Sequence, residues 1–110
     1  MEPAVPSLLR PDLSLASIDP VRAAELGFAP AYMDMATTRI YLSFDASGRP
    51  TLHHSLAGLP AALVWARSIY GDPLVVKPTL RPGYVRGGFF YTLGSTARAL
   101  REWDVEAAVE

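Results

Sequence analysis

The chain has 110 residues, the length of one domain, which argues against an enzyme built from two domains around a cleft. Half of its residues are hydrophobic and 19% are charged, a balance that argues against a disordered chain. Ten basic and eleven acidic residues give a net charge of −1, so no overall basic field attracts phosphate backbones. Cysteine is absent, which excludes disulfides, thiolate metal sites and thiol catalysis.

The N-terminal region is rich in proline, with three prolines among its first twelve residues. This composition predicts an extended arm over residues 1–12, ahead of a single domain over residues 13–110. No run of eighteen apolar residues occurs, and the first residues lack the charge and continuous apolar stretch of a signal peptide. We therefore expect a cytoplasmic protein without a membrane partner.

The first regular elements are predicted to be short. Apolar residues alternate with small polar ones over 13–17, which predicts a short strand. A two-turn helix is predicted over 19–27, because Asp19 is a capping residue, Pro20 suits the first helical position and Gly27 suits the exit. We expect this helix to dock through three apolar side chains, those of Val21, Ala24 and Leu26.

A period of two begins at residue 39 and predicts a strand over 39–44. Turn-forming residues fill 45–50 and extended character resumes over 51–56, so we expect these two strands to form a hairpin. The alternation divides the first strand into two faces, with Ile40, Leu42 and Phe44 on one and Arg39, Tyr41 and Ser43 on the other.

Residues 61–67 fit either a strand or one helical turn. We predict a strand, because a strong turn signal follows at 70–73 and the β-branched residues of 74–77 supply a partner. Pro78 and Pro82 donate no backbone hydrogen bond, which places the end of that partner strand at an edge or a bulge.

The clearest local pattern is the aromatic segment 83–92, where Gly87 and Gly88 supply the turn of a second hairpin. Hydroxyl residues then precede an amphipathic helix over 96–107. The expected fold is therefore α+β, an antiparallel sheet of hairpins with a short N-terminal helix and an amphipathic C-terminal helix, both covering one face.

No pattern in the sequence indicates an enzyme. His53 and His54 are consecutive in a predicted strand and would point to opposite faces, so the pair is not expected to hold one metal. Phosphate-binding glycine motifs and the G-x-S-x-G nucleophile motif are also missing. We predict no catalytic residues, no metal and no cofactor.

The aromatic hairpin is the predicted contact site, since two short helices cannot cover both faces of a sheet rich in aromatic rings. We expect a protein partner, or a second copy of the chain, to cover the exposed face. The alternative is a nucleic-acid-associated regulator, in which bases stack on the rings and arginines contact phosphate, although the net charge opposes it. The predicted contacts are Tyr84, Arg86, Phe89 and Tyr91, with Trp103 behind them.

Three stretches carry a family resemblance: 26–33, 58–60, and 75–78 running into 83–92. Together they resemble small uncharacterised proteins of GC-rich proteobacteria, often carried on plasmids, prophages or integrative elements. The resemblance implies an accessory protein of a mobile element that binds and blocks, or regulates, a host protein. It transfers no catalytic residues, because the matching stretches are structural turns and strands.

Overall fold

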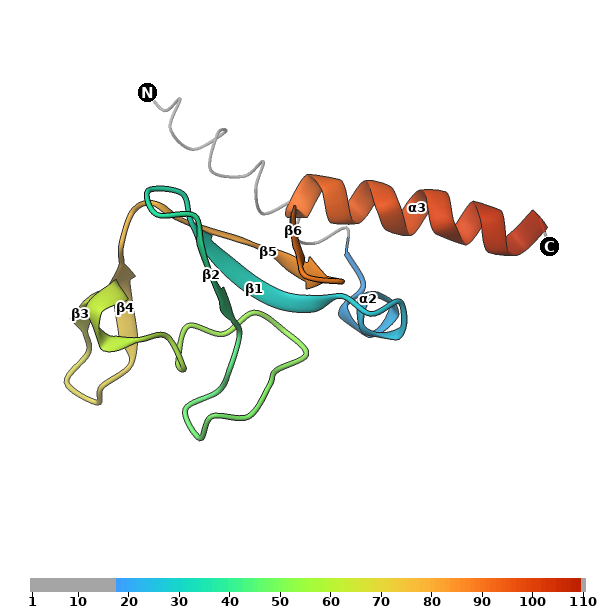
Figure 1. The fold of residues 1–110 in the computed structure, drawn as a ribbon. Helices are drawn as coiled ribbons and strands as arrows, with labels where there is room; N and C mark the ends of the chain where they lie inside the picture. Colours follow the sequence, from blue (N-terminus) through green and yellow to red (C-terminus); the bar gives the residue numbers. More distant parts are fainter. Residues whose placement is uncertain (1–17, 110) are drawn as a thin grey trace, which may run out of the picture.

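The computed structural model describes residues 18–109 and shows an α+β fold (Figure 1). Helix α2 spans Pro20–Glu25 and helix α3 spans Leu93–Val109. The strands between them are β1 Ala29–Asp34, β2 Arg39–Leu42, β3 Val64–Arg67, β4 Pro73–Val76, β5 Leu80–Arg86 and β6 Phe89–Thr92. The predicted arm over 1–12 and the predicted strand over 13–17 lie outside the described residues.

The strands form two antiparallel sheets, which confirms the predicted fold class. The larger sheet has the order β2-β1-β5-β6, and β3 pairs with β4 in a separate hairpin. Figure 1 shows α3 beside β5 and β6, while the β3–β4 hairpin projects at the other end of the sheet. One 3₁₀ turn, Ala61–Leu63, precedes β3, so the segment 61–67 contains both of the conformations considered for it.

The predicted hairpin between 39–44 and 51–56 is wrong. Residues 51–56 form bends and irregular structure, and β2 pairs instead with β1, a strand that the sequence analysis missed. The β1–β2 register places Tyr32 opposite Tyr41 and Met33 opposite Ile40. Beyond β2, a single antiparallel bridge joins Phe44 to Pro50, the last residue of the predicted turn.

Pro30 explains why β1 is hard to recognise, because proline in a strand usually indicates an edge. Here it lies in a central strand. The backbone N–H of Ser43 donates to the carbonyl of Pro30 at 2.9 Å, while the carbonyl of Ser43 accepts from the N–H of Thr51 at 3.3 Å. Thr51 thus supplies the donor that Pro30 lacks, and no acceptor is left unsatisfied at this point.

Helix α2 is confirmed, together with its caps. The carboxylate of Asp19 accepts from the N–H of Val21 at 3.0 Å, and Gly27 leaves the helix with a φ of 91°. The predicted docking face is only partly right, since of its three residues Leu26 packs against the core cluster around Tyr84. Ala23 is the fully buried residue, while Val21 and Ala24 are exposed. In a helix of only two turns, the angle at which it packs on the sheet decides which side chains are buried.

The aromatic hairpin of β5 and β6 is also confirmed. Gly87 and Gly88 have φ values of 60° and 84°, the two positive angles that a tight hairpin turn of this type requires. Helix α3 begins at Leu93, three residues before the predicted start. Its first turn is capped by the hydroxyl of Thr92, which accepts from the N–H of Ser95 at 3.0 Å.

Two apolar clusters lie on the same face of the larger sheet. Tyr32 is opposite Pro82 and Tyr84 is opposite Pro30, so the side chains of these four residues share one face. Tyr84 packs with both helices in a cluster whose other buried members are Ile18, Ala23, Phe28, Leu93, Ala97, Ala99 and Leu100. Tyr32 packs with Leu59, Leu63 and Leu80. The two helices therefore cover the same face, as predicted.

Candidate interaction surfaces

Four of the five predicted contact residues come together in one packed group. Phe28 stacks on Trp103 with ring centroids 5.4 Å apart, and it makes T-shaped contacts with Tyr91 and Tyr84 at centroid distances of 5.1 Å and 6.3 Å. We call these four rings, with Arg86, the aromatic cluster. It joins the connection between α2 and β1, where Phe28 lies, to the β5–β6 hairpin and α3, so its first role is to hold these elements together.

Arg86 completes the aromatic cluster. Its guanidinium carbon lies 4.7 Å from the ring centroid of Trp103 and 5.8 Å from that of Phe28. Its Nε donates to the carbonyl of Leu26 at 2.7 Å. Leu26 is the C-cap residue of α2. The guanidinium of Arg86 therefore stacks on the rings and also supplies a hydrogen-bond donor to a carbonyl at the end of this helix.

The members of the predicted contact set differ greatly in exposure. Tyr84 is 2% exposed, and burial raises the pKa of its hydroxyl. Tyr91 and Trp103 are half-buried. Phe89, at the turn end of β6, is 71% exposed and stands outside the cluster. Phe89 therefore offers the largest accessible apolar surface of this set, while Tyr84 supports the hairpin from inside.

Serine substitutions at Phe89 and Tyr91 distinguish a ring that is free to contact a partner from a ring that stabilises the fold by packing. We expect Phe89→Ser to change the free energy of unfolding by less than about 0.5 kcal/mol, because the ring is exposed. Tyr91→Ser should lower it by about 1–3 kcal/mol, since the half-buried ring makes a T-shaped contact with Phe28. Urea unfolding followed by circular dichroism measures both, and equal losses would contradict this division.

A larger exposed apolar surface lies on the β3–β4 hairpin. Trp65 is 60% exposed, Leu74 63%, Tyr70 85% and Ile69 92%, and Val75 is also exposed. We call these five residues the hairpin surface. Val64 and Val76 pack against the cluster around Tyr32 and anchor the hairpin to the larger sheet. Large apolar side chains gathered outside the core of a protein typically mark a contact with another molecule.

The turn of this hairpin is fixed by hydrogen bonds. The N–H of Ser68 donates to the carbonyl of Asp72 at 2.8 Å, and the hydroxyl of Ser68 accepts from the N–H of Tyr70 and of Asp72. Arg67 donates from its guanidinium to the carbonyl of Gly71 at 2.9 Å. Ile69 and Tyr70 are thus held outward by an ordered turn, which reduces the entropy lost when a partner binds.

Sequence reasoning did not identify the hairpin surface as functional. It predicted the turn at 70–73 and the strands on either side, but treated them as structure alone. The available signal was the lack of polar alternation in a hairpin with Trp65, Ile69 and Tyr70 close together. Whether such residues face a core or the solvent depends on long-range packing.

His53 and His54 line one pocket, which corrects the prediction that they point to opposite faces. The prediction assumed a strand, and this segment is a bend. The pocket has a volume of about 160 Å³, and the other described residues that line it are Ile18, Pro20 and Tyr84, none of which is a carboxylate. The Nε2 of His54 lies 2.7 Å from the carbonyl oxygen of Gly83, and burial lowers the pKa of this histidine.

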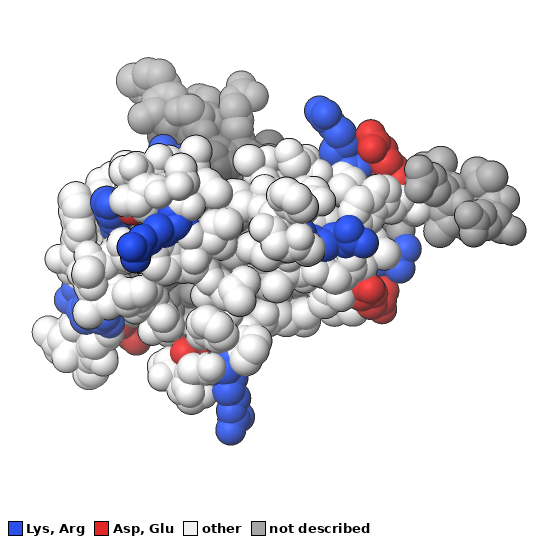
Figure 2. Space-filling model, viewed as in Figure 1, with Lys and Arg blue, Asp and Glu red and all other residues white. Residues whose placement is uncertain are grey.

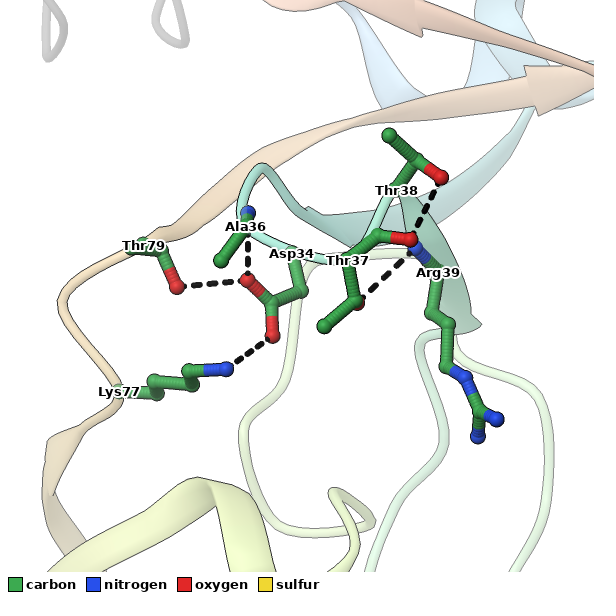
Figure 3. Close-up of polar contacts among 7 residues, drawn as sticks. All are labelled: Asp34, Ala36, Thr37, Thr38, Arg39, Lys77 and Thr79. Carbon is green, nitrogen blue, oxygen red and sulfur yellow. Dashed lines mark hydrogen bonds and ion pairs between the residues drawn. The ribbon is translucent and has the colours of Figure 1, made fainter.

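A buried carboxylate, that of Asp34, ties β1 to the β4–β5 connection (Figure 3). It is 1% exposed and accepts from Lys77 Nζ at 2.6 Å, from the hydroxyl of Thr79 at 2.6 Å and from the N–H of Ala36 at 2.9 Å. These hydrogen bonds, led by that of Lys77, lower the pKa of Asp34 to about 2. Both carboxylate oxygens thus accept hydrogen bonds from within the protein, which indicates a structural role for Asp34.

The charged residues on the face shown in Figure 2 do not form a continuous basic groove. Figure 2 shows lysine and arginine side chains scattered over the visible face, with uncharged atoms between them and acidic residues among them. Among the residues whose side chains the structure describes, 18–103, His, Asp and Glu form no group of three or more that is able to bind a metal ion. None of the helices in that part combines the length and apolar character needed to cross a bilayer.

Comparisons of the chain with protein-family models, with curated proteins and with solved structures gave no match. The resemblance to mobile-element proteins therefore stays a prediction.

Proposed function

We propose that this chain is a protein-interaction domain that works by binding and not by catalysis, with the hairpin surface as its main contact. The observation that carries the proposal is the near-complete exposure of Ile69 and Tyr70, together with the exposure of Trp65 and Leu74 on the same ordered hairpin. Tryptophan and tyrosine are enriched at the residues that contribute most to protein–protein affinity.

The shape of the hairpin supports this function. It is anchored at one end by Val64 and Val76 and projects from the larger sheet (Figure 1). A projecting element with apolar side chains is able to enter a groove on a partner, as a pre-ordered hairpin loses little entropy on docking. Within the wider proposal, the chain is a cytoplasmic mobile-element accessory, and the partner is a host protein that it binds or inhibits.

The alternative function, regulation of nucleic acid by an aromatic and arginine face, has less support. Arg86, the arginine of the aromatic cluster, already stacks on Trp103 and donates to the carbonyl of Leu26. A phosphate would have to compete with both contacts. Binding to nucleic acid is therefore treated as an outcome of the test, recognised by affinity that falls steeply with salt.

The proposal is tested by capturing partners with the intact chain and with the double variant Trp65→Ser/Leu74→Ser. We expect proteins bound by the intact chain to be lost from the variant, with the circular dichroism spectrum unchanged, because both side chains are exposed. A protein identified in this way is then purified and titrated by calorimetry. Its dissociation constant should rise at least tenfold for the variant.

Phe89→Ser is the matched control, since it also removes one exposed aromatic ring but from β6. We expect it to keep its partners. Loss of binding in this variant alone would move the contact to the aromatic hairpin predicted from sequence. The proposal would be overturned if the intact chain, the double variant and Phe89→Ser all captured the same partners equally. It would also be overturned if nucleic acid alone were recovered, with a steep salt dependence.

A further inference from the structure

The pocket beside His53 and His54 contains a polar group that the fold itself does not use. Tyr84 lines this pocket and is only 2% exposed. Within the described part of the chain, no residue forms a hydrogen bond with its hydroxyl group. A buried hydroxyl without a partner costs free energy, so such groups usually bond to water or to a ligand.

The packing of Tyr84 leaves its hydroxyl end for the pocket. Its ring makes T-shaped contacts with Phe28, at a centroid distance of 6.3 Å, and with His54, at 5.0 Å. Side chains of both helices pack in the same cluster. The ring is enclosed by these neighbours, so the hydroxyl is the part left to reach the pocket. Burial raises the pKa of this hydroxyl, which therefore remains a hydrogen-bond donor at neutral pH.

His54 is fixed in place as a wall of the pocket. Its Nε2 donates to the carbonyl of Gly83 at 2.7 Å, and its ring also makes a T-shaped contact with Tyr32 at a centroid distance of 5.4 Å. Burial lowers the pKa of His54, so this imidazole is uncharged at neutral pH. His53 is exposed, which places the pocket at the surface, within reach of a ligand in solution.

The size and charge of the pocket limit what it is able to bind. Its volume of about 160 Å³ is close to the roughly 150 Å³ of an apolar cavity that binds benzene. Its described lining residues carry no carboxylate, ammonium or guanidinium group. The neighbouring carboxylate of Asp19 already accepts from the N–H groups of Val21 and Arg22, and it opposes an anion. A charged ligand would therefore lose its hydration without gaining an opposite charge.

We propose that this pocket binds a small, uncharged phenol, a single aromatic ring that carries one hydroxyl group. The hydroxyl of the ligand pairs with that of Tyr84, and its ring packs against the apolar side chains of Ile18 and Pro20 and against the imidazoles. This inference goes beyond the proposed function. None of the described pocket residues belongs to the hairpin surface, so each proposal can fail without the other.

Phenol itself is the probe for the first experiment. The chain has two histidines, and both line the pocket, so the imidazole C–H signals of the NMR spectrum report on it directly. We expect phenol to shift these signals until they saturate, with one site per chain. Benzoate is the charged control and should shift neither signal at the same concentration. The inference would be overturned if phenol gave no saturable shift, or if benzoate bound as tightly as phenol.

Tyr84→Phe tests the hydroxyl while keeping the ring. It should raise the dissociation constant for phenol at least about fivefold and leave that for benzene unchanged, because benzene has no hydroxyl to pair. Tyr32→Phe is the matched control, since it removes a hydroxyl from another buried tyrosine, one outside the described lining of the pocket. We expect it to bind phenol as the intact chain does. Equal loss of affinity in the two variants, or normal binding of phenol by Tyr84→Phe, would overturn the inference.

Discussion

Phe28→Ala is expected to lower the free energy of unfolding by about 3–5 kcal/mol. Phe28 is 2% exposed, and its ring contacts Tyr84, Tyr91 and Trp103, so alanine leaves a cavity where three other rings meet. Arg86 also loses one of the two rings beneath its guanidinium. A domain of this size has a total stability of roughly 5–15 kcal/mol, so much of it depends on this one side chain.

Phe89→Ala is the control for this experiment, because it makes the same substitution at an exposed ring. Urea unfolding should show a loss near zero for Phe89→Ala and a much lower midpoint for Phe28→Ala, with equal slopes. Similar midpoints for the two variants would show that the aromatic cluster does not hold the β5–β6 hairpin against α3.

The elements that sequence reasoning identified are those whose signals are local. Asp19 and Gly27 cap α2 within their own segment, and Gly87 and Gly88 fix the turn of the β5–β6 hairpin without help from distant residues. The fold class follows from the order of these elements. Their physical causes lie within a few residues of each other, so a single sequence is sufficient to reveal them.

The elements that were missed depend on contacts between distant residues. Pro30 is tolerated in β1 because Thr51, twenty-one positions later, bonds the carbonyl of Ser43. No local pattern reports this compensation. Residues 51–56, predicted as a strand, form bends and irregular structure that begins at this same contact.

The surfaces were harder to predict than the elements. Tyr84 and Trp65 are both aromatic residues in hairpin strands, yet the first is buried and the second is exposed. The difference arises from tertiary packing, because the helices cover Tyr84 while nothing among the described clusters covers Trp65. Composition and alternation describe a residue type and its neighbours, and they do not specify which element will pack above it.

Asp34→Asn is expected to cause the largest loss of thermal stability among single substitutions of charged residues in the described part of the chain. The carboxylate is buried and accepts from Lys77, Thr79 and Ala36, whereas an amide offers one oxygen and no charge to Lys77. Lys77 then keeps a positive charge that is only partly exposed to water. Asp72→Asn, in the exposed turn of the β3–β4 hairpin, is the matched control and should leave the melting temperature unchanged.

The lowered pKa of Asp34 determines the direction in which the stability of the fold changes with pH. The pKa of Asp34 is about 2 in the folded chain, below its ordinary value of 3.8, so the unfolded chain binds the proton more tightly. The stabilisation is fully present above about pH 5 and is lost as the pH falls from there toward 2. Melting temperatures of the intact chain and Asp34→Asn should therefore converge across this window, while Asp72→Asn follows the intact chain. Parallel profiles for Asp34→Asn and the intact chain would show that the Lys77 pair stabilises nothing, and that β1 is held to the β4–β5 connection by backbone bonds alone.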